Sequence, residues 1–157
     1  MESSHAAAPP VVQLPSGPDQ LILAAEFPAL SPVQLFAYWT EPDLVCRWWP
    51  QEAHVEPRLG GHYRFSWPQM HWHLRGHYTT FAPGQALAFT WQWDHDPDQP
   101  ERIVTLGLTP RATGGTRLTL THGPYTDSAD DQDERIAHHL EGWQHFLPKL
   151  QEMLPLR

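Results

Sequence analysis

The chain changes from one hydrophobic spacing to another along its length. From residue 51 to residue 122 apolar and polar positions alternate, and side chains two apart on a strand share a face, so this alternation predicts strands with one buried face. We expect strands at 51–55, 62–67, 71–81, 87–93, 103–109 and 116–122, preceded by a more apolar strand at 19–27. Glycine pairs at 60–61 and 114–115 and the Pro83–Gly84 pair are typical of the turns between such strands.

Two short helices are predicted between the first strand and the alternating region. Ser31 has the features of an N-cap, and Pro32 fits the first helical position, where its missing N–H costs nothing. Apolar residues at positions 35, 36 and 39 follow at helical spacing. Residues 40–42 end this helix, and we expect a second one over 43–48, before Pro50.

The C-terminal segment predicts one long amphipathic helix over about residues 128–154. Its apolar positions recur at the spacing of a single helical face, and they are Ile136, Leu140, Trp143, Phe146, Leu147 and Leu150. Acidic residues crowd positions 127–133, where they would lie at the positive end of the helix dipole. Pro148 removes an intrahelical hydrogen bond, so it should kink the helix or end it early.

The length of 157 residues fits one domain. Residues 1–18 are rich in Ala, Ser and Pro and predict a flexible N-terminal arm, which leaves 19–157 as the domain. The single cysteine, Cys46, excludes an intrachain disulfide framework. We expect neither a signal peptide nor a membrane span, and therefore a cytoplasmic protein. A net charge of −8 argues against binding to nucleic acid, which needs Lys and Arg to neutralise phosphates.

Four short sequence motifs resemble those of a known family. They are Arg47–Trp48–Trp49–Pro50 after Pro42–Asp43–Leu44, the 60–65 segment Gly-Gly-His-Tyr-Arg-Phe, Arg75–Gly76–His77–Tyr78 followed by 87–91, and the 114–122 segment followed by Glu141–Gly142–Trp143. In this order they resemble the activator-of-Hsp90-ATPase homologue 1-like (AHSA1-like) family of the START/Bet v 1-like superfamily. The resemblance implies an α+β helix-grip fold, in which a curved antiparallel sheet of about six to seven strands wraps around the long C-terminal helix. It also implies a cavity between sheet and helix, and it raises an Hsp90-like protein as a partner.

Aromatic residues are the main candidates for a binding site, because ligand pockets are mostly apolar with a few orienting polar groups. Residues 87–93 would form one wall, the last helix would form the facing wall, and residues 36–49 would close one end. The candidate ligand-binding residues are Phe36, Trp39, Trp48, Trp49, Phe65, Arg75, Tyr78, Phe89, Trp91, Trp93, His122, Trp143 and Phe146. Only one of Arg75 and Tyr78 can face inward on a regular strand. The alternative is that these large side chains fill the interior completely.

Other chemistry has weaker support in the sequence. His71 and His73 would share a strand face, as zinc ligands do, but no third ligand motif accompanies them and Arg75 would oppose a metal. We therefore expect no metal and no cofactor. An acid–base pair of His122 and Glu141 would need contact at about 3 Å, so no catalytic residue is assigned.

Three functions remain open. The leading one is binding of a small apolar or aromatic molecule. The alternatives are an Hsp90-cochaperone-like interaction domain and an enzyme of the cyclase or hydrolase kind that uses the same cavity. The sequence is compatible with a monomer or a homodimer.

Overall fold

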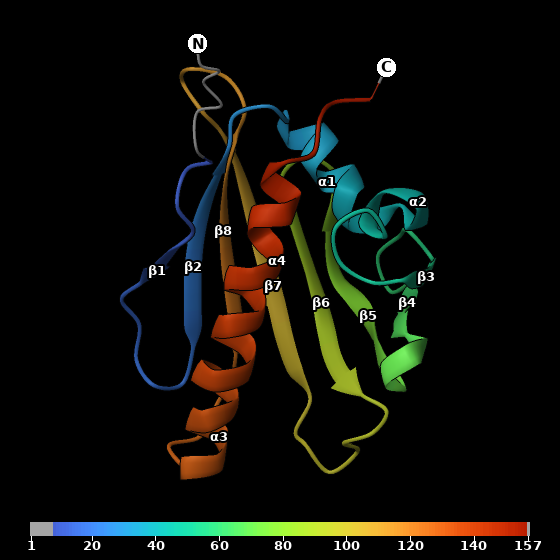
Figure 1. Ribbon diagram of the computed structural model, residues 1–157, viewed down its shortest axis with the longest axis vertical. Coiled ribbons are helices and arrows are strands. Elements are labelled where there is room, and N and C mark those ends of the chain that lie inside the picture. The colour runs from blue at the N-terminus through green and yellow to red at the C-terminus, as the bar shows by residue number, and fades with distance from the viewer. Residues whose placement is uncertain (1–7, 157) are drawn as a thin grey trace.

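The computed structural model describes residues 8–156, and it places a long C-terminal helix across one face of a curved antiparallel sheet (Figure 1). The sheet has eight strands in the order β1-β2-β8-β7-β6-β5-β4-β3. Their bounds are β1 Val12–Leu14, β2 Leu21–Phe27, β3 Glu52–Val55, β4 His62–Trp67, β5 Trp72–Ala82, β6 Ala86–Trp93, β7 Arg102–Pro110 and β8 Thr116–Gly123. The predicted helix-grip fold is confirmed.

Two short helices follow β2, as predicted. Helix α1 (Pro32–Thr40) begins with a capping box, in which the Ser31 hydroxyl accepts from the Gln34 amide at 3.2 Å and Gln34 Oε1 accepts from the Ser31 amide at 2.9 Å. This arrangement satisfies two N–H groups that lack partners within the helix. Helix α2 (Pro42–Val45) is shorter than the predicted 43–48 helix. A 3-10 turn, η1 (Pro68–Met70), links β4 to β5.

The C-terminal helix is continuous but not uniform. It starts as α3 (Ala129–Asp133), passes through the π-helical segment η2 (Glu134–Leu140) and ends as α4 (Glu141–Gln151). The helix continues for three residues beyond Pro148 and ends three residues before the predicted boundary at 154. The π-helical segment was not predicted, because its residues keep an ordinary helical hydrophobic spacing.

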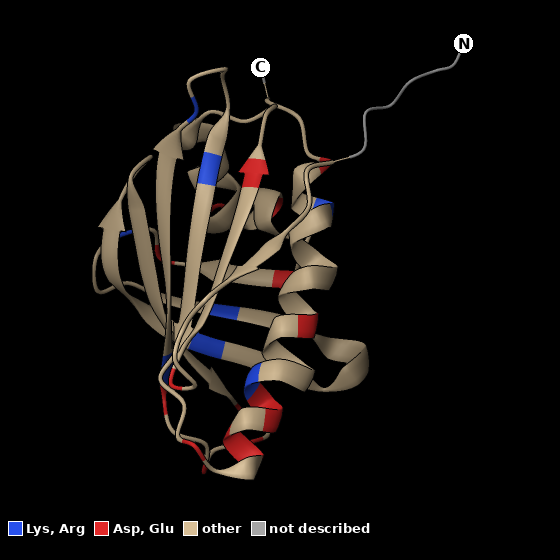
Figure 2. Ribbon diagram, turned by 90° about the vertical axis from the view of Figure 1, so that its left-hand side faces the viewer, with Lys and Arg blue, Asp and Glu red and all other residues tan. Residues whose placement is uncertain are grey.

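The core lies between the helix and the concave face of the sheet, as the edge-on view in Figure 2 shows. Alternate positions of β7 and β8, among them Val104, Leu106, Leu118 and Leu120, are completely buried, while the positions between them are more exposed. Leu147 and Leu150 of α4 are also completely buried. The predicted one-sided burial of these strands is thus present in the fold.

The N-terminal region differs from the prediction of a flexible arm. Val12–Leu14 form strand β1, which pairs antiparallel with β2 and raises the strand count to eight. The Gln151 side-chain amide donates to the Pro9 and Glu26 carbonyls at 2.9 Å each, so the last helix also holds this segment. The nearby prolines concealed the short β-forming run in the sequence. Residues 1–7 of the predicted arm lie outside the described residues.

Candidate functional site

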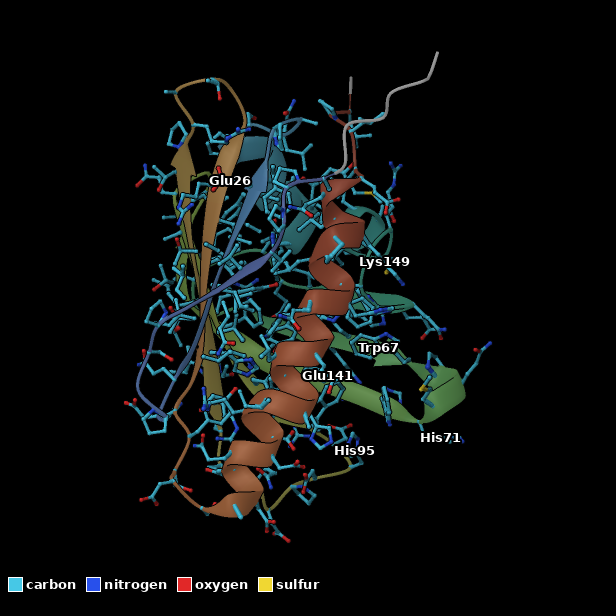
Figure 3. The ribbon with its side chains drawn as sticks, turned by 60° about the vertical axis from the view of Figure 1, so that its left-hand side comes forward. Glu26, Trp67, His71, His95, Glu141 and Lys149 are labelled. Carbon is cyan, nitrogen blue, oxygen red and sulfur yellow. The ribbon has the colours of Figure 1, made fainter. Side chains whose placement is uncertain are left out.

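A groove of about 710 Å³ lies between the C-terminal helix and the ends of β4, β5 and β6. In Figure 3 Trp67 stands across from Glu141 of the helix, with His95 below them. We call this space the aromatic groove. Its aromatic lining residues are Trp49, Trp67, Trp72, Trp91, Trp93, Trp143 and Phe146. The remaining lining residues are Met70, Ala137 and Gly142, the carboxylates Asp96, Glu134 and Glu141, and the histidines His95, His138, His139 and His145.

The back of the groove is a cluster of tryptophans in direct ring contact. Trp49 stacks on Trp91 with 5.9 Å between ring centres and 21° between planes. Trp143 of α4 lies 5.1 Å from Trp49 and 5.7 Å from Trp91. The two predicted walls, one from β6 and one from the helix, therefore touch each other at this level. The open space lies beside that contact, toward the η1 turn.

The outer part of the groove is formed by tryptophans near the β4–β5 connection. Trp93 lies 5.7 Å from Trp67 and 6.2 Å from Trp72, measured between ring centres. The Trp67 indole N–H donates to the Trp49 carbonyl at 3.2 Å, which ties this part to the back wall. Trp72 is 43% exposed. The groove thus has a buried back and an accessible front.

Two stacked histidines lie beside the tryptophans, and one of them, His139, also lines the groove. The Trp143 indole N–H donates to His122 Nδ1 at 3.1 Å, so the neutral His122 ring carries its proton on Nε2. The His122 and His139 rings stack at 4.2 Å with 15° between their planes. Burial, with smaller effects from His139 and Arg102, lowers the pKa of His122 well below its ordinary value. Burial also lowers the pKa of His139, against the raising effect of Glu134.

Glu134 joins two histidines of the helix to the groove. Its Oε1 lies 2.9 Å from His138 Nδ1 and its Oε2 lies 3.3 Å from His139 Nε2. The contact with His139 has the largest effect, and together with that to His138 it lowers the pKa of Glu134 to about 2, so the carboxylate is charged at neutral pH. On an α-helix the adjacent residues His138 and His139 would point about 100° apart and could not share a partner. The π-helical turn instead brings residues i+4 and i+5 to the same carboxylate.

The structure divides the predicted binding residues into three groups. Five line the aromatic groove, and they are Trp49, Trp91, Trp93, Trp143 and Phe146. Six are buried in the core away from it, and they are Phe36, Trp39, Trp48, Phe65, Tyr78 and Phe89. His122 lies behind Trp143, and Arg75 is exposed and pairs with Asp94. Tyr78, not Arg75, therefore faces the core.

Two arrangements considered from the sequence, a shared face for His71 and His73 and a His122–Glu141 pair, are not found in the described residues. His71 ends the η1 turn in a left-handed conformation (φ 57°) before β5 begins, so it does not share a strand face with His73. His73 Nδ1 lies 2.8 Å from the Ser66 hydroxyl. Within residues 8–156 no three potential metal ligands gather. Glu141 is exposed, whereas His122 is fully buried and bonded to Trp143, so these two do not form the acid–base pair considered above.

Several groove residues were missed from the sequence. Trp67 shares a strand face with the predicted Phe65, and Trp72 shares one with the buried Leu74, so the alternation could have identified both. The polar residues of η2 and of the β6–β7 loop had no comparable signal. Their position depends on how the helix packs against the sheet.

The sheet that curves around a long C-terminal helix defines a class of protein, the helix-grip domains. Within that class the chain belongs to the activator of Hsp90 ATPase homolog 1-like protein family, whose model matches residues 29–155. No curated protein matches the sequence significantly. Among residues 8–156 no helix has the length and apolar character needed to cross a membrane.

Solved structures of bacterial proteins share the fold. A protein from Rhodobacter sphaeroides is 26% identical, with a TM-score of 0.75 over 90% of this chain and 95% of that chain. A protein from Mesorhizobium loti is 23% identical, with a TM-score of 0.73 over 85% and 94%. The Aha1 dimer from Colwellia psychrerythraea, a solution structure, is 17% identical, with a TM-score of 0.72 over 87% and 96%.

Proposed function

We propose that this protein binds a small, partly aromatic molecule in the aromatic groove. The observation that carries the proposal is the lining, in which seven aromatic side chains from five parts of the chain surround one open space. A volume of about 710 Å³ lies within the range of small-molecule sites, roughly 300–1,000 Å³. The proposed ligand occupies the groove and not the packed interior between sheet and helix.

The ring contacts at the back of the groove support a site that is largely formed before binding. Trp49, Trp91 and Trp143 brace one another, and Trp143 is further fixed by its hydrogen bond to His122. A ligand that stacks on such a wall loses little affinity to the ordering of side chains. Polar groups of the lining, including the Glu134 carboxylate, would then set its orientation.

A substitution at Gly142 tests the site without removing any contact. Gly142 lines the groove, and a Cβ at this position meets no atom within 4 Å. Gly142→Leu should therefore occupy the part of the groove beside Trp143 and obstruct a ligand there, while the helix gains up to about 1 kcal/mol in propensity. The matched control is Gln144→Leu, an exposed position of the same helix that does not line the groove.

The measurement is tryptophan fluorescence during titration with a library of small aromatic compounds. We expect saturable changes for the wild type and the Gln144→Leu control, and their loss in Gly142→Leu with unchanged circular dichroism. No response to any compound in the wild type, or equal binding by Gly142→Leu, would reject the proposal.

The family description supports a second candidate, an interaction with an Hsp90-type ATPase. The Hsp90 ATPase rate in the presence and absence of the purified protein tests it. Stimulation that persists in Gly142→Leu would show that this interaction does not use the aromatic groove.

A further inference from the structure

The ionisable side chains that line the aromatic groove are three carboxylates and four histidines, two of which contact Glu134. Three carboxylates, Asp96, Glu134 and Glu141, line it, and none of the described lining residues is a lysine or an arginine. The nearby Lys149 places its ammonium 5.2 Å from the Phe146 ring centre but does not line the groove. A ligand of this site therefore meets acidic groups without a fixed cation.

The carboxylates come from opposite sides of the aromatic surface. Glu134 and Glu141 belong to the helix side, and Asp96 follows the end of β6. Figure 2 shows acidic positions crowded at the start of this helix and isolated ones farther along it, and Figure 3 shows Glu141 across from Trp67. Indole faces carry negative electrostatic potential and attract cations, tryptophan more strongly than tyrosine or phenylalanine. The rings and the carboxylates thus favour the same sign of charge.

Stabilisation of the helix start accounts for only part of this charge. The interaction of an acidic side chain with the helix dipole falls off within the first turn. Glu141 lies twelve residues after Ala129, the first residue of the helix, which corresponds to about 18 Å along its axis. Among the described contacts Glu141 has no ion-pair partner. Neither an ion pair nor the helix start therefore explains its charge, and it lines the groove.

We propose that the groove selects a small organic cation, an ammonium compound with an aromatic or branched alkyl body. This inference rests on the proposed ligand-binding function and specifies its ligand class. The apolar body stacks on the tryptophans, the cationic head meets ring faces, and the carboxylates supply the longer-range attraction. Aromatic anions are excluded by the same charges.

The test compares three probes of similar size that differ in charge. Phenyltrimethylammonium is a cation, tert-butylbenzene is its neutral isostere, and benzenesulfonate is an anion. Each is titrated at low ionic strength, with tryptophan fluorescence excited at 295 nm. We expect the cation to bind about tenfold more tightly than the neutral isostere, as a desolvated cation–π contact allows, and the anion not to bind.

Two variants connect the preference to the groove. Glu141→Gln should reduce the cation preference several-fold and leave the affinity for tert-butylbenzene unchanged. Glu152→Gln, an exposed acid outside the groove, is the matched control and should behave as the wild type. Equal affinities for the cation and its neutral isostere would overturn the inference while the proposed ligand-binding function stands. Failure of all three probes, together with silence across the aromatic library, would reject both.

Discussion

Replacement of Arg102 by methionine tests how the C-terminal helix is fixed on the sheet. The Arg102 side chain is 3% exposed and lies 3.2 Å from Asp131 Oδ1, near the start of the helix. The guanidinium also donates to the Pro124 carbonyl and to Gln99, and it covers the Tyr125 ring at 4.5 Å. Methionine keeps much of the apolar volume but removes the charge and all three hydrogen-bond contacts.

The expected loss of stability follows from what Asp131 retains. Removing one partner of a buried ion pair costs about 3–5 kcal/mol, because the other charge stays buried. Asp131 keeps hydrogen bonds from the Thr126 amide at 2.7 Å and the Thr126 hydroxyl at 2.9 Å, and it lies in the first turn of the helix. We therefore expect the low end, about 3 kcal/mol, which is a large fraction of a typical stability of 5–15 kcal/mol.

Urea unfolding followed by far-ultraviolet circular dichroism measures this loss. A double-mutant cycle with Asp131→Asn separates the pair from the rest of the network, and we expect a coupling of about 1–3 kcal/mol between the two positions. A loss below about 1 kcal/mol for Arg102→Met, or additive effects in the cycle, would refute the reasoning. Arg102 would then be a solvated contact of the helix start and not its anchor.

Two further predictions concern packing and pH. Gly76→Ala should lower the free energy of unfolding in urea by more than about 3 kcal/mol, because the added Cβ would lie 2.1 Å from the Thr90 carbonyl oxygen. The control Gly107→Ala, with free space around its Cβ, should change this free energy by less than about 1 kcal/mol. Similar effects at both positions would contradict the strand packing. The folded-state pKa values of His122 and His139 are lowered, so the unfolded chain binds protons first and stability should fall as pH drops below about 6.5. Urea midpoints at pH 7.5 and 5.5 measure this fall, which should be shallower in His139→Gln; equal midpoints in the wild type would show that the two imidazoles are not buried as neutral rings.

The fold could be predicted largely because each element has its own local signal. The Ser31 cap, the glycine turns and the alternation in β7 and β8 depend on neighbouring residues only. Strand β1 was missed since three residues give too little alternation, and its place depends on pairing with β2. The π-helical segment was missed for a related reason, because its hydrogen bonds are not encoded in hydrophobic spacing.

For the candidate site, the sequence indicated part of the aromatic lining but not the polar lining. Alternation correctly placed Trp91 and Trp93 on the inner face of β6, and helical spacing placed Trp143 opposite them. Aromatic residues that fill the core and those that line the groove have the same sequence pattern. Packing between distant elements decides which of them border open space, and the pattern does not contain that information. The meeting of Glu134 with His139 requires a backbone geometry that no single-residue propensity reveals.

The packing around Trp39 has a consequence for where this fold could hold a ligand. Trp39 contacts Trp48, Trp49, Phe89 and Trp143 at ring-centre distances of 4.7–6.3 Å, so the space between helix and sheet is occupied there by the protein itself. Entry of a ligand into that space would require the tryptophan cluster to separate, at the cost of the packing that holds the helix. The aromatic groove lies on the outer side of the same cluster, so we expect these ring contacts to keep the surface that it would offer to a ligand rigid. Affinity at this site should therefore depend on the fit and charge of the ligand, and not on opening of the fold.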